Sequence, residues 1–328
     1  MWGLAGRCWK FRRVSDAERN EAQDSRRQQK LAVFASFGLV LLWGANFSIQ
    51  KTVFATLGPG PFLFARYLIL PSAAYWLLRQ RGLLRLPTRD DFWALGRLGL
   101  KGHLLHVGFV TWGIYWSTPF SSALILACGP VFTLLILRAT GVETPRRSQT
   151  LGVALALVGV VVFLSDKLLL GRWSAGLGDL VLLGAAALFS WYTVSSKPLV
   201  ERLGSAATMG WSTLLGSLPV LIVSAHAGLT YDWHLPGAIV WAGLLWSVLV
   251  ASFAGWLVWA WINAVRGVAK TAPLMYLMPP VAGAVSWALG GESFTVIQVA
   301  GALIALAGVG MAQFGRQFAQ RFRTPTPV

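Results

Sequence analysis

The chain has 328 residues, of which 55% are hydrophobic and only 12% are charged, and its mean hydropathy is +0.60. A soluble domain has roughly 25% charged residues, so this composition excludes an ordinary soluble protein and favours one that spans a membrane. The net charge of +16 would suit a nucleic-acid partner. However, the Lys and Arg residues lie in short segments between apolar blocks, where positive charge usually reports membrane orientation. We therefore expect no nucleic-acid partner.

The apolar blocks are about 20 residues long, enough at ~1.5 Å per residue to cross a hydrocarbon core ~30 Å thick. A basic tail over residues 1–30 precedes the first block, and residues 315–328 form a tail at the other end. Between the tails we predict an all-α integral membrane fold with about ten transmembrane helices. They cover approximately residues 31–50, 61–79, 96–116, 120–138, 148–166, 176–197, 205–225, 237–262, 270–290 and 294–314.

The Lys and Arg residues are unevenly distributed over the segments that flank these helices. Of the 28, the two tails and every second connection hold 24, whereas the other connections hold only Lys51, Lys167 and Arg172, and Arg66 lies within a helix. Cytoplasmic segments of membrane proteins carry an excess of Lys and Arg. We therefore expect a multi-pass protein of the inner or plasma membrane with both termini in the cytoplasm.

The sequence also repeats itself with a shift of 149 residues. Residues 121–162 align without gaps to residues 270–311, and 11 of the 42 pairs are identical. Five predicted helices fall in each half, residues 31–166 and 167–314, and an odd number means that the halves insert with opposite orientation. Inverted repeats build many transporters, with the substrate site near the membrane midplane. The identical pairs include Pro130/Pro279, Glu143/Glu292, Gln149/Gln298, Gly152/Gly301 and Gly159/Gly308.

Several motifs resemble those of EamA-type proteins in the drug/metabolite transporter superfamily. The run Trp43-Gly44-Ala45-Asn46-Phe47 is similar to the family's WGxNF opening, and residues 189–193, which include Tyr192, are similar to its second-half counterpart. Arg66 and the paired Pro, Glu, Gly, Gly pattern that ends each half also match, so the resemblance covers about residues 31–314. The sequence departs from the family where Thr140-Gly141-Val142-Glu143 stands in place of the usual leucine-glycine-glutamate and where Phe189 replaces a common tryptophan. The resemblance implies transport of metabolites such as amino acids, nucleobases or drugs, without fixing the cargo.

Arg66 is the one cation inside a predicted helix, about six residues from its start. An intramembrane ionisable residue is a functional candidate, although its side chain could instead extend to the headgroups or pair structurally. Trp43, Asn46 and Gln50 are spaced i, i+3 and i+7, so they share one helix face. This stripe suits either the lining of a cavity or hydrogen bonds between helices.

Aromatic residues supply the other candidates. Trp256 and Trp259 continue a stripe that starts at Ser252, and Trp112 lies one turn before Trp116 in the third helix, where an interfacial belt is the alternative. His103 and His106 could handle protons, but we expect them to pack near the cytoplasmic start of that helix. The predicted substrate-binding residues are Arg66, Trp43, Asn46, Gln50, Trp112, Tyr192, Trp256, Trp259 and Tyr276.

The remaining motifs indicate structure rather than chemistry. Glu143 and Glu292 fall on opposite sides of the membrane, so they cannot form a catalytic pair and instead suit helix starts. Glycines repeat in the fifth and tenth helices. Small residues let helices approach each other closely, so we expect these two helices to be scaffold. Cys8 and Cys128 are far apart, and no metal-ligand or cofactor motif is present. We therefore predict no enzyme activity, metal or cofactor.

Taken together, these patterns predict a transporter of small metabolites, such as amino acids, related organic solutes or drugs. It would work as an exporter or a facilitative exchanger by alternating access between the two inverted halves. The expected partners are a small-molecule substrate and membrane lipids. The alternatives are a membrane-embedded lipid-modifying enzyme, which would need convergent His, Asp, Glu or Cys residues, and a channel. The sequence does not fix the oligomeric state.

Overall fold

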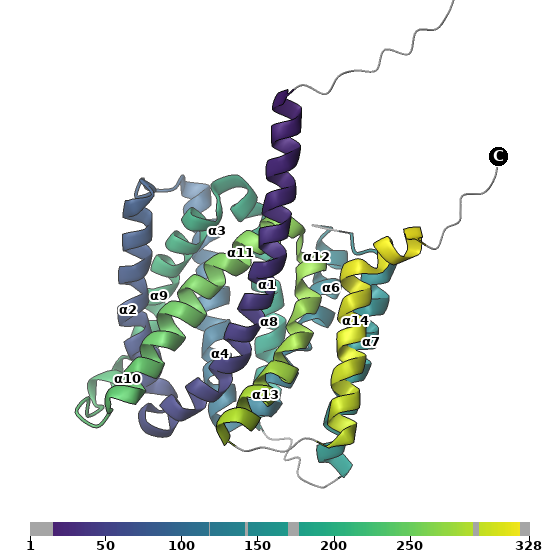
Figure 1. Cartoon of the computed structure of the whole chain (residues 1–328). Coiled ribbons are helices and arrows are strands. Elements are labelled where there is room, and N and C mark those ends of the chain that lie inside the picture. Colours follow the sequence, from purple (N-terminus) through teal and green to yellow (C-terminus); the bar gives the residue numbers. More distant parts are fainter. Residues whose placement is uncertain (1–15, 118, 142–143, 170–176, 291–294, 322–328) are drawn as a thin grey trace, which may run out of the picture.

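The computed structural model describes residues 16–117, 119–141, 144–169, 177–290 and 295–321, and within these ranges every regular element is a helix. The helices stand side by side in one bundle (Figure 1). Two π-helical segments, η1 (Leu100–His106) and η2 (Trp246–Ala254), and one 3-10 segment, η3 (Ala272–Leu277), continue α-helices without a loop. The α-helices are α1 (Asp16–Leu57), α2 (Pro59–Gln80), α3 (Arg89–Gly99), α4 (Val107–Trp116), α5 (Pro119–Leu126), α6 (Gly129–Thr140), α7 (Arg147–Leu169), α8 (Leu177–Leu203), α9 (Ser205–Leu229), α10 (Ala238–Leu245), α11 (Gly255–Arg266), α12 (Val268–Thr271), α13 (Met278–Gly290) and α14 (Val296–Arg321).

Several of these helices combine into single crossings of the bundle. The helix α3 continues through η1 into α4, and α10 continues through η2 into α11. The pairs α5 and α6, and the series α12, η3 and α13, each form one interrupted crossing. Over the described residues the chain therefore crosses the bundle ten times, as predicted. The start of α1 and the end of α14 lie at the same end of the bundle (Figure 1), as an even number of crossings requires.

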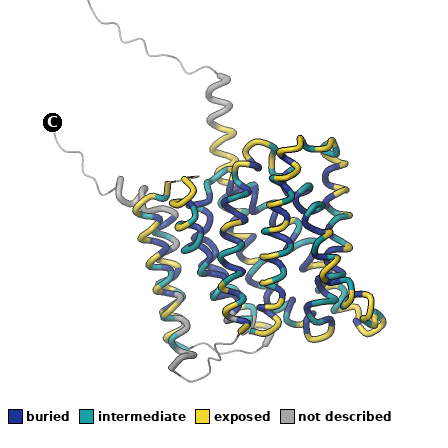
Figure 2. The backbone as a smooth tube through the Cα atoms, turned by 180° about the vertical axis from the view of Figure 1, so that it is seen from behind, coloured by how far each residue is buried: buried dark blue, intermediate teal, exposed yellow. Residues whose placement is uncertain are grey.

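The outer surface of the bundle is apolar. Large side chains such as Phe34, Trp76, Ile222 and Val223 are exposed, and exposed positions follow the outward faces of the helices (Figure 2). Such a surface suits lipid rather than water. Among the described residues, six helical stretches are each long and apolar enough to cross a membrane: Gln23–Leu57, Pro59–Gln80, Ser122–Thr140, Leu180–Leu203, Ser205–Leu229 and Ala238–Arg266.

Two helices begin earlier than hydropathy indicated. The first starts at Asp16 rather than near residue 31, so residues 16–30 of the predicted tail are a helical extension of the first span. The third starts at Arg89 rather than near residue 96, and the hydroxyl of Thr88 accepts a hydrogen bond from the backbone N–H of Asp91 at its N-terminus. Such a cap fixes a helix start independently of hydropathy. The second correction places His103 and His106 in the middle of a crossing.

The two halves meet at the predicted glycines of α7 and α14. A Cβ added to Gly152 would lie 2.7 Å from the carbonyl oxygen of Gly308, and one added to Gly159 would lie 2.7 Å from that of Gly301. Because Gly152 matches Gly301 and Gly159 matches Gly308 in the repeat, these contacts are reciprocal, as a pseudo-two-fold axis requires. The expected close approach of the fifth and tenth helices is confirmed.

The repeated prolines lie at interruptions of matched crossings. Pro130 is the second residue of α6, which begins after a two-residue break from α5. Pro279 is the second residue of α13, which follows the 3-10 segment η3. A proline lacks a backbone donor and clashes with the carbonyl four residues earlier, so it disrupts the preceding turn. The fourth and ninth crossings are therefore both broken near the middle of the bundle.

Candidate substrate-binding cavity

A cavity lies between the two halves, with an empty volume of about 650 Å³ that is partly open to the outside. Its walls come from α1, α2, α4, α5, α8, α11, α13 and the segments η1, η2 and η3, so both repeats contribute. Gln50 lies seven residues before the end of α1, and Arg66 lies seven residues after the start of α2. The cavity thus occupies the half of the bundle nearer the turn between α1 and α2.

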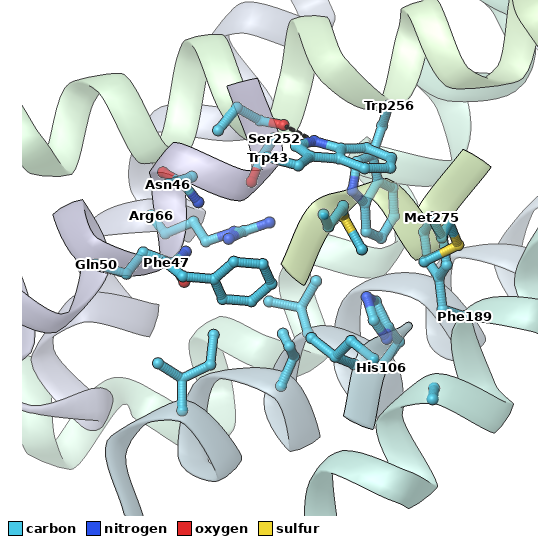
Figure 3. Close-up of a pocket in the computed structure, with 17 residues that line it drawn as sticks. Trp43, Asn46, Phe47, Gln50, Arg66, His106, Phe189, Ser252, Trp256 and Met275 are labelled. Atoms are coloured by element: carbon cyan, nitrogen blue, oxygen red, sulfur yellow. Dashed lines mark hydrogen bonds between the residues drawn. The ribbon is translucent and has the colours of Figure 1, made fainter. Parts of the chain in front are cut away.

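Arg66 points into this cavity, between Asn46 and Phe47 (Figure 3). Its residue surface is only 3% exposed, and its position in α2 corresponds to a depth of about 10 Å at helical rise. The side chain therefore does not extend to the headgroups. Among the described residues its Nε atom has no hydrogen-bond partner and no carboxylate forms an ion pair with its guanidinium. The ring of Tyr67 lies 5.8 Å from its Cζ atom.

The predicted stripe on α1 lines the cavity as one face. Trp43, Asn46 and Gln50 all belong to the wall. Two of them also bind η2: the Nε1 of Trp43 donates to the carbonyl oxygen of Ala251 at 2.8 Å, and Asn46 Oδ1 accepts from the Ser247 hydroxyl at 2.9 Å. The stripe therefore serves as cavity lining and as a source of hydrogen bonds between helices, because these residues line the cavity and join α1 to the second half.

An aromatic cluster closes the other end of the cavity. Trp256 and Phe189 belong to the wall, and Tyr192 and Trp259 pack behind them, with ring centroids 4.7 Å apart for Tyr192 and Trp256 and 5.8 Å apart for Phe189 and Trp259. Trp259 is fixed by a 3.0 Å hydrogen bond from its Nε1 to the hydroxyl of Thr193. Tyr192 and Trp259 thus support the wall rather than line it.

The structure does not bring the other two predicted residues to the cavity wall. Trp112 is 38% exposed and packs against Trp116, with ring centroids 5.0 Å apart. On α4, Val107, Val110 and Ile114 face the cavity, so Trp112 faces away from it. This position agrees with the alternative interpretation, in which Trp112 belongs to an interfacial belt. Tyr276 is fully buried in η3 beside the wall residue Met275, and its hydroxyl has no partner among the described residues.

The described residues also contain no group of three His, Cys, Asp or Glu side chains that could hold a metal ion. The wall instead combines one cation, amide and hydroxyl groups, aromatic rings and thioethers. This set can bind and orient an organic solute, with one end in contact with a charged group and the other in an apolar surrounding.

Comparison with known proteins identifies the protein family. The EamA-like transporter family matches residues 30–165 and again residues 176–313, once in each half of the chain. The chain belongs to the EamA-like transporter family. It is therefore a multi-pass membrane transporter of small metabolites, and its family is one of transporters rather than enzymes.

Relatives of this EamA-like transporter carry related names. A protein of Salmonella typhimurium named "Probable amino-acid metabolite efflux pump" is 28% identical over 86% of this chain and 94% of its own length. Its Escherichia coli namesake is 27% identical over 84% and 93%. A "Probable terminal-alkyne amino-acid exporter" of Streptantibioticus cattleyicolor is 25% identical over 90% and 97%. A solved crystal structure with a TM-score of 0.69 and 19% identity covers 90% of this chain and 99% of that one, which shows a shared fold.

Sequence reasoning missed several wall residues of this EamA-like transporter, above all His106. We expected His103 and His106 near the membrane interface, but both are buried. His106 lines the cavity with its Nδ1 2.9 Å from the carbonyl oxygen of Ala185, and His103 Nδ1 lies 3.2 Å from the hydroxyl of Tyr67. The expectation was wrong because the third helix starts at Arg89, and the cap residue Thr88 was the available signal.

The histidines lie on η1, and the matching crossing of the second half contains η2. Adding the repeat shift of 149 residues to 100–106 gives 249–255, which overlaps η2 at 246–254. Short π-helical segments are rare and are frequently found at functional sites. Each half therefore presents an irregular helix to the cavity at the same place, which hydropathy and helical periodicity could not reveal.

Proposed function

We propose that this protein exports small metabolites that carry a carboxylate, such as amino acids or related organic solutes, across the plasma membrane by alternating access. Arg66 supports this proposal most directly. Removing one partner of a buried ion pair destabilises a protein by about 3–5 kcal/mol, so a buried charge without a counter-ion is costly, and a substrate carboxylate would supply that counter-ion. The planar guanidinium can bind a carboxylate through two parallel hydrogen bonds. The names of the amino-acid exporters among its relatives agree with this substrate class.

The position of the cavity supports a transport cycle. It extends toward the turn between α1 and α2, while the aromatic cluster of Phe189, Tyr192, Trp256 and Trp259 closes it on the other side. A cavity closed at one end is one state of alternating access, and the inverted halves, residues 31–166 and 167–314, would exchange conformations to give the other. A channel would instead need a continuous path through this cluster.

The distribution of charge supports an orientation for this cycle. Since 24 of the 28 Lys and Arg residues lie in the tails and alternate connections, we place both termini in the cytoplasm. The cavity then faces the exterior, in the state that follows release of an exported solute. When the solute is present on both sides of the membrane, the same motion would operate as facilitative exchange.

Exchange in proteoliposomes that contain the purified full chain tests this proposal. Labelled amino acids and other carboxylates should show saturable counterflow. Arg66→Lys should weaken substrate binding about tenfold, or ~1.4 kcal/mol, because an ammonium cannot reproduce the bidentate geometry, and Arg66→Ala should abolish it. Arg79→Lys, at the exposed end of the same helix, is the matched control and should leave binding unchanged. Equal affinity in the wild type and both Arg66 variants would exclude this residue from the binding site.

A further inference from the structure

Resting on the function proposed above, we infer that the cavity selects net anions, namely monocarboxylates with an apolar or aromatic tail, over zwitterionic amino acids. The charge of the cavity wall favours an anion. Arg66 is buried, directed into the cavity and without a carboxylate partner among the described residues, and the wall residues that the structure describes include no carboxylate. A solute with one negative charge neutralises this site, whereas a zwitterion brings an additional ammonium group close to the guanidinium.

The polar groups near Arg66 give an ammonium few acceptors. Asn46 Oδ1 already accepts a hydrogen bond from Ser247, and the indole N–H of Trp43 is a donor bound to Ala251. The side chains of Gln50 and Ser252, and the ring nitrogen of His106 that does not face Ala185, are the neutral acceptors that remain on the described wall. Neutral oxygens and aromatic faces can bind a cation, but they do not cancel the positive charge of Arg66. The amine of an amino acid is therefore less favourable here than a neutral group of the same size.

The opposite side of the cavity is suited to an apolar tail. In Figure 3 the guanidinium of Arg66 lies on the side of Asn46 and Gln50, and Phe189 and Met275 lie across the cavity. Met278 and Leu126 add further apolar side chains to the wall. Thioether side chains are flexible and polarisable, so they can adapt to aromatic or branched tails. The preferred solute therefore has its carboxylate at Arg66 and an apolar body that reaches toward Phe189.

The test measures the affinity of the purified full chain for a matched series of probes by calorimetry. Phenylalanine and 3-phenyllactate have almost the same shape, but the second has a neutral hydroxyl in place of the ammonium. 3-Phenylpropionate lacks this group, and phenethylamine lacks the carboxylate. We expect 3-phenyllactate and 3-phenylpropionate to bind about tenfold more tightly than phenylalanine, and phenethylamine not to bind. Phenylalanine that binds as tightly as 3-phenyllactate would overturn the proposal.

Three variants, one of them a control, separate this inference from the proposed function. In Arg66→Gln the amide can still donate a hydrogen bond to a carboxylate, so weak binding should stay measurable, and the ratio between 3-phenyllactate and phenylalanine should fall to about one. Arg79→Gln should preserve the ratio. Asp179 lies on α8 seven residues before the wall residue Ala186, and Asp179→Asn should leave the ratio unchanged. A ratio that rises in Asp179→Asn would show that this carboxylate serves a substrate amine and would overturn the anion preference. Failure of every carboxylate to bind would instead contradict the proposed function itself.

Discussion

The indole Nε1 of Trp43 in α1 donates a 2.8 Å hydrogen bond to the carbonyl oxygen of Ala251 in η2. This bond joins the first half of the chain to the second at the wall of the cavity. A π-helical segment interrupts the regular backbone pairing of an α-helix, and the carbonyl of Ala251 has a side-chain partner in the indole. One turn further along α1, Asn46 accepts from Ser247 of the same segment. The wall of the site is therefore also the link between the halves.

Trp43→Phe should weaken this link without removing the aromatic ring from the wall. A lost hydrogen bond costs about 1 kcal/mol, and the smaller ring leaves part of its volume empty, so we expect a lower melting temperature and a several-fold change in exchange rate. Trp76→Phe is the control, because Trp76 is 62% exposed on the outer surface of α2. Thermal unfolding and counterflow, measured on both variants, compare the two substitutions. Equal effects of the two substitutions would contradict a specific link.

The contact between α7 and α14 predicts a severe effect of very small substitutions. Gly159→Ala would place a methyl group 2.7 Å from the carbonyl oxygen of Gly301, and because this neighbour is backbone, the helices must move apart. Overpacking of this kind costs about 1–3 kcal/mol. Gly310→Ala, on α14 with no atom within 4 Å of the new Cβ, should be neutral. Melting temperature and yield of monodisperse protein measure the difference, and a wild-type melting curve for Gly159→Ala would contradict the close packing.

Orientation in the membrane can be tested with reporter fusions. We expect fusions after Leu86, Gly141, Arg202 and Arg266 to behave as cytoplasmic, since these positions follow even-numbered crossings or flank basic connections. A fusion after Tyr231, which follows α9 at the opposite end of the bundle, should behave as external. Activity of a cytoplasmic reporter at Tyr231 would reverse the proposed orientation and with it the direction in which the cavity faces.

Much of this arrangement could be predicted because helical spacing is local. The i, i+3, i+7 pattern places Trp43, Asn46 and Gln50 on one face, and the structure puts all three in the wall. The glycines of α7 and α14 could likewise be assigned to a close contact, because only small residues permit it. Both predictions depend on regular α-helix and on residues within one helix.

The rest depends on irregular helix and on contacts between distant segments. The segments η1 and η2 differ from α-helix in the number of residues per turn. A spacing of 3.6 residues per turn therefore no longer predicts which residues share a face beyond these segments. Ser252 and Trp256 reach the wall, whereas Trp259 packs behind it. Met275 enters through a 3-10 segment, whose side-chain directions also differ from those of an α-helix. Local periodicity could therefore not have placed His106, Phe189 and Met275 in the wall of the cavity that holds Arg66.

The matched interruptions at Pro130 and Pro279 predict where the transporter bends. Each proline follows a break in its crossing, between α5 and α6 in the first half and between η3 and α13 in the second. Restoring the backbone donor with alanine would favour a continuous helix, since the proline ring no longer clashes with the preceding turn. If alternating access requires motion at these breaks, Pro130→Ala and Pro279→Ala should slow exchange several-fold while substrate affinity stays near the wild-type value. Pro219→Ala is the control, because this proline lies inside the continuous helix α9. Counterflow rates and calorimetric affinities distinguish the two effects, and unchanged turnover in both Pro130→Ala and Pro279→Ala would show that the breaks are static bends.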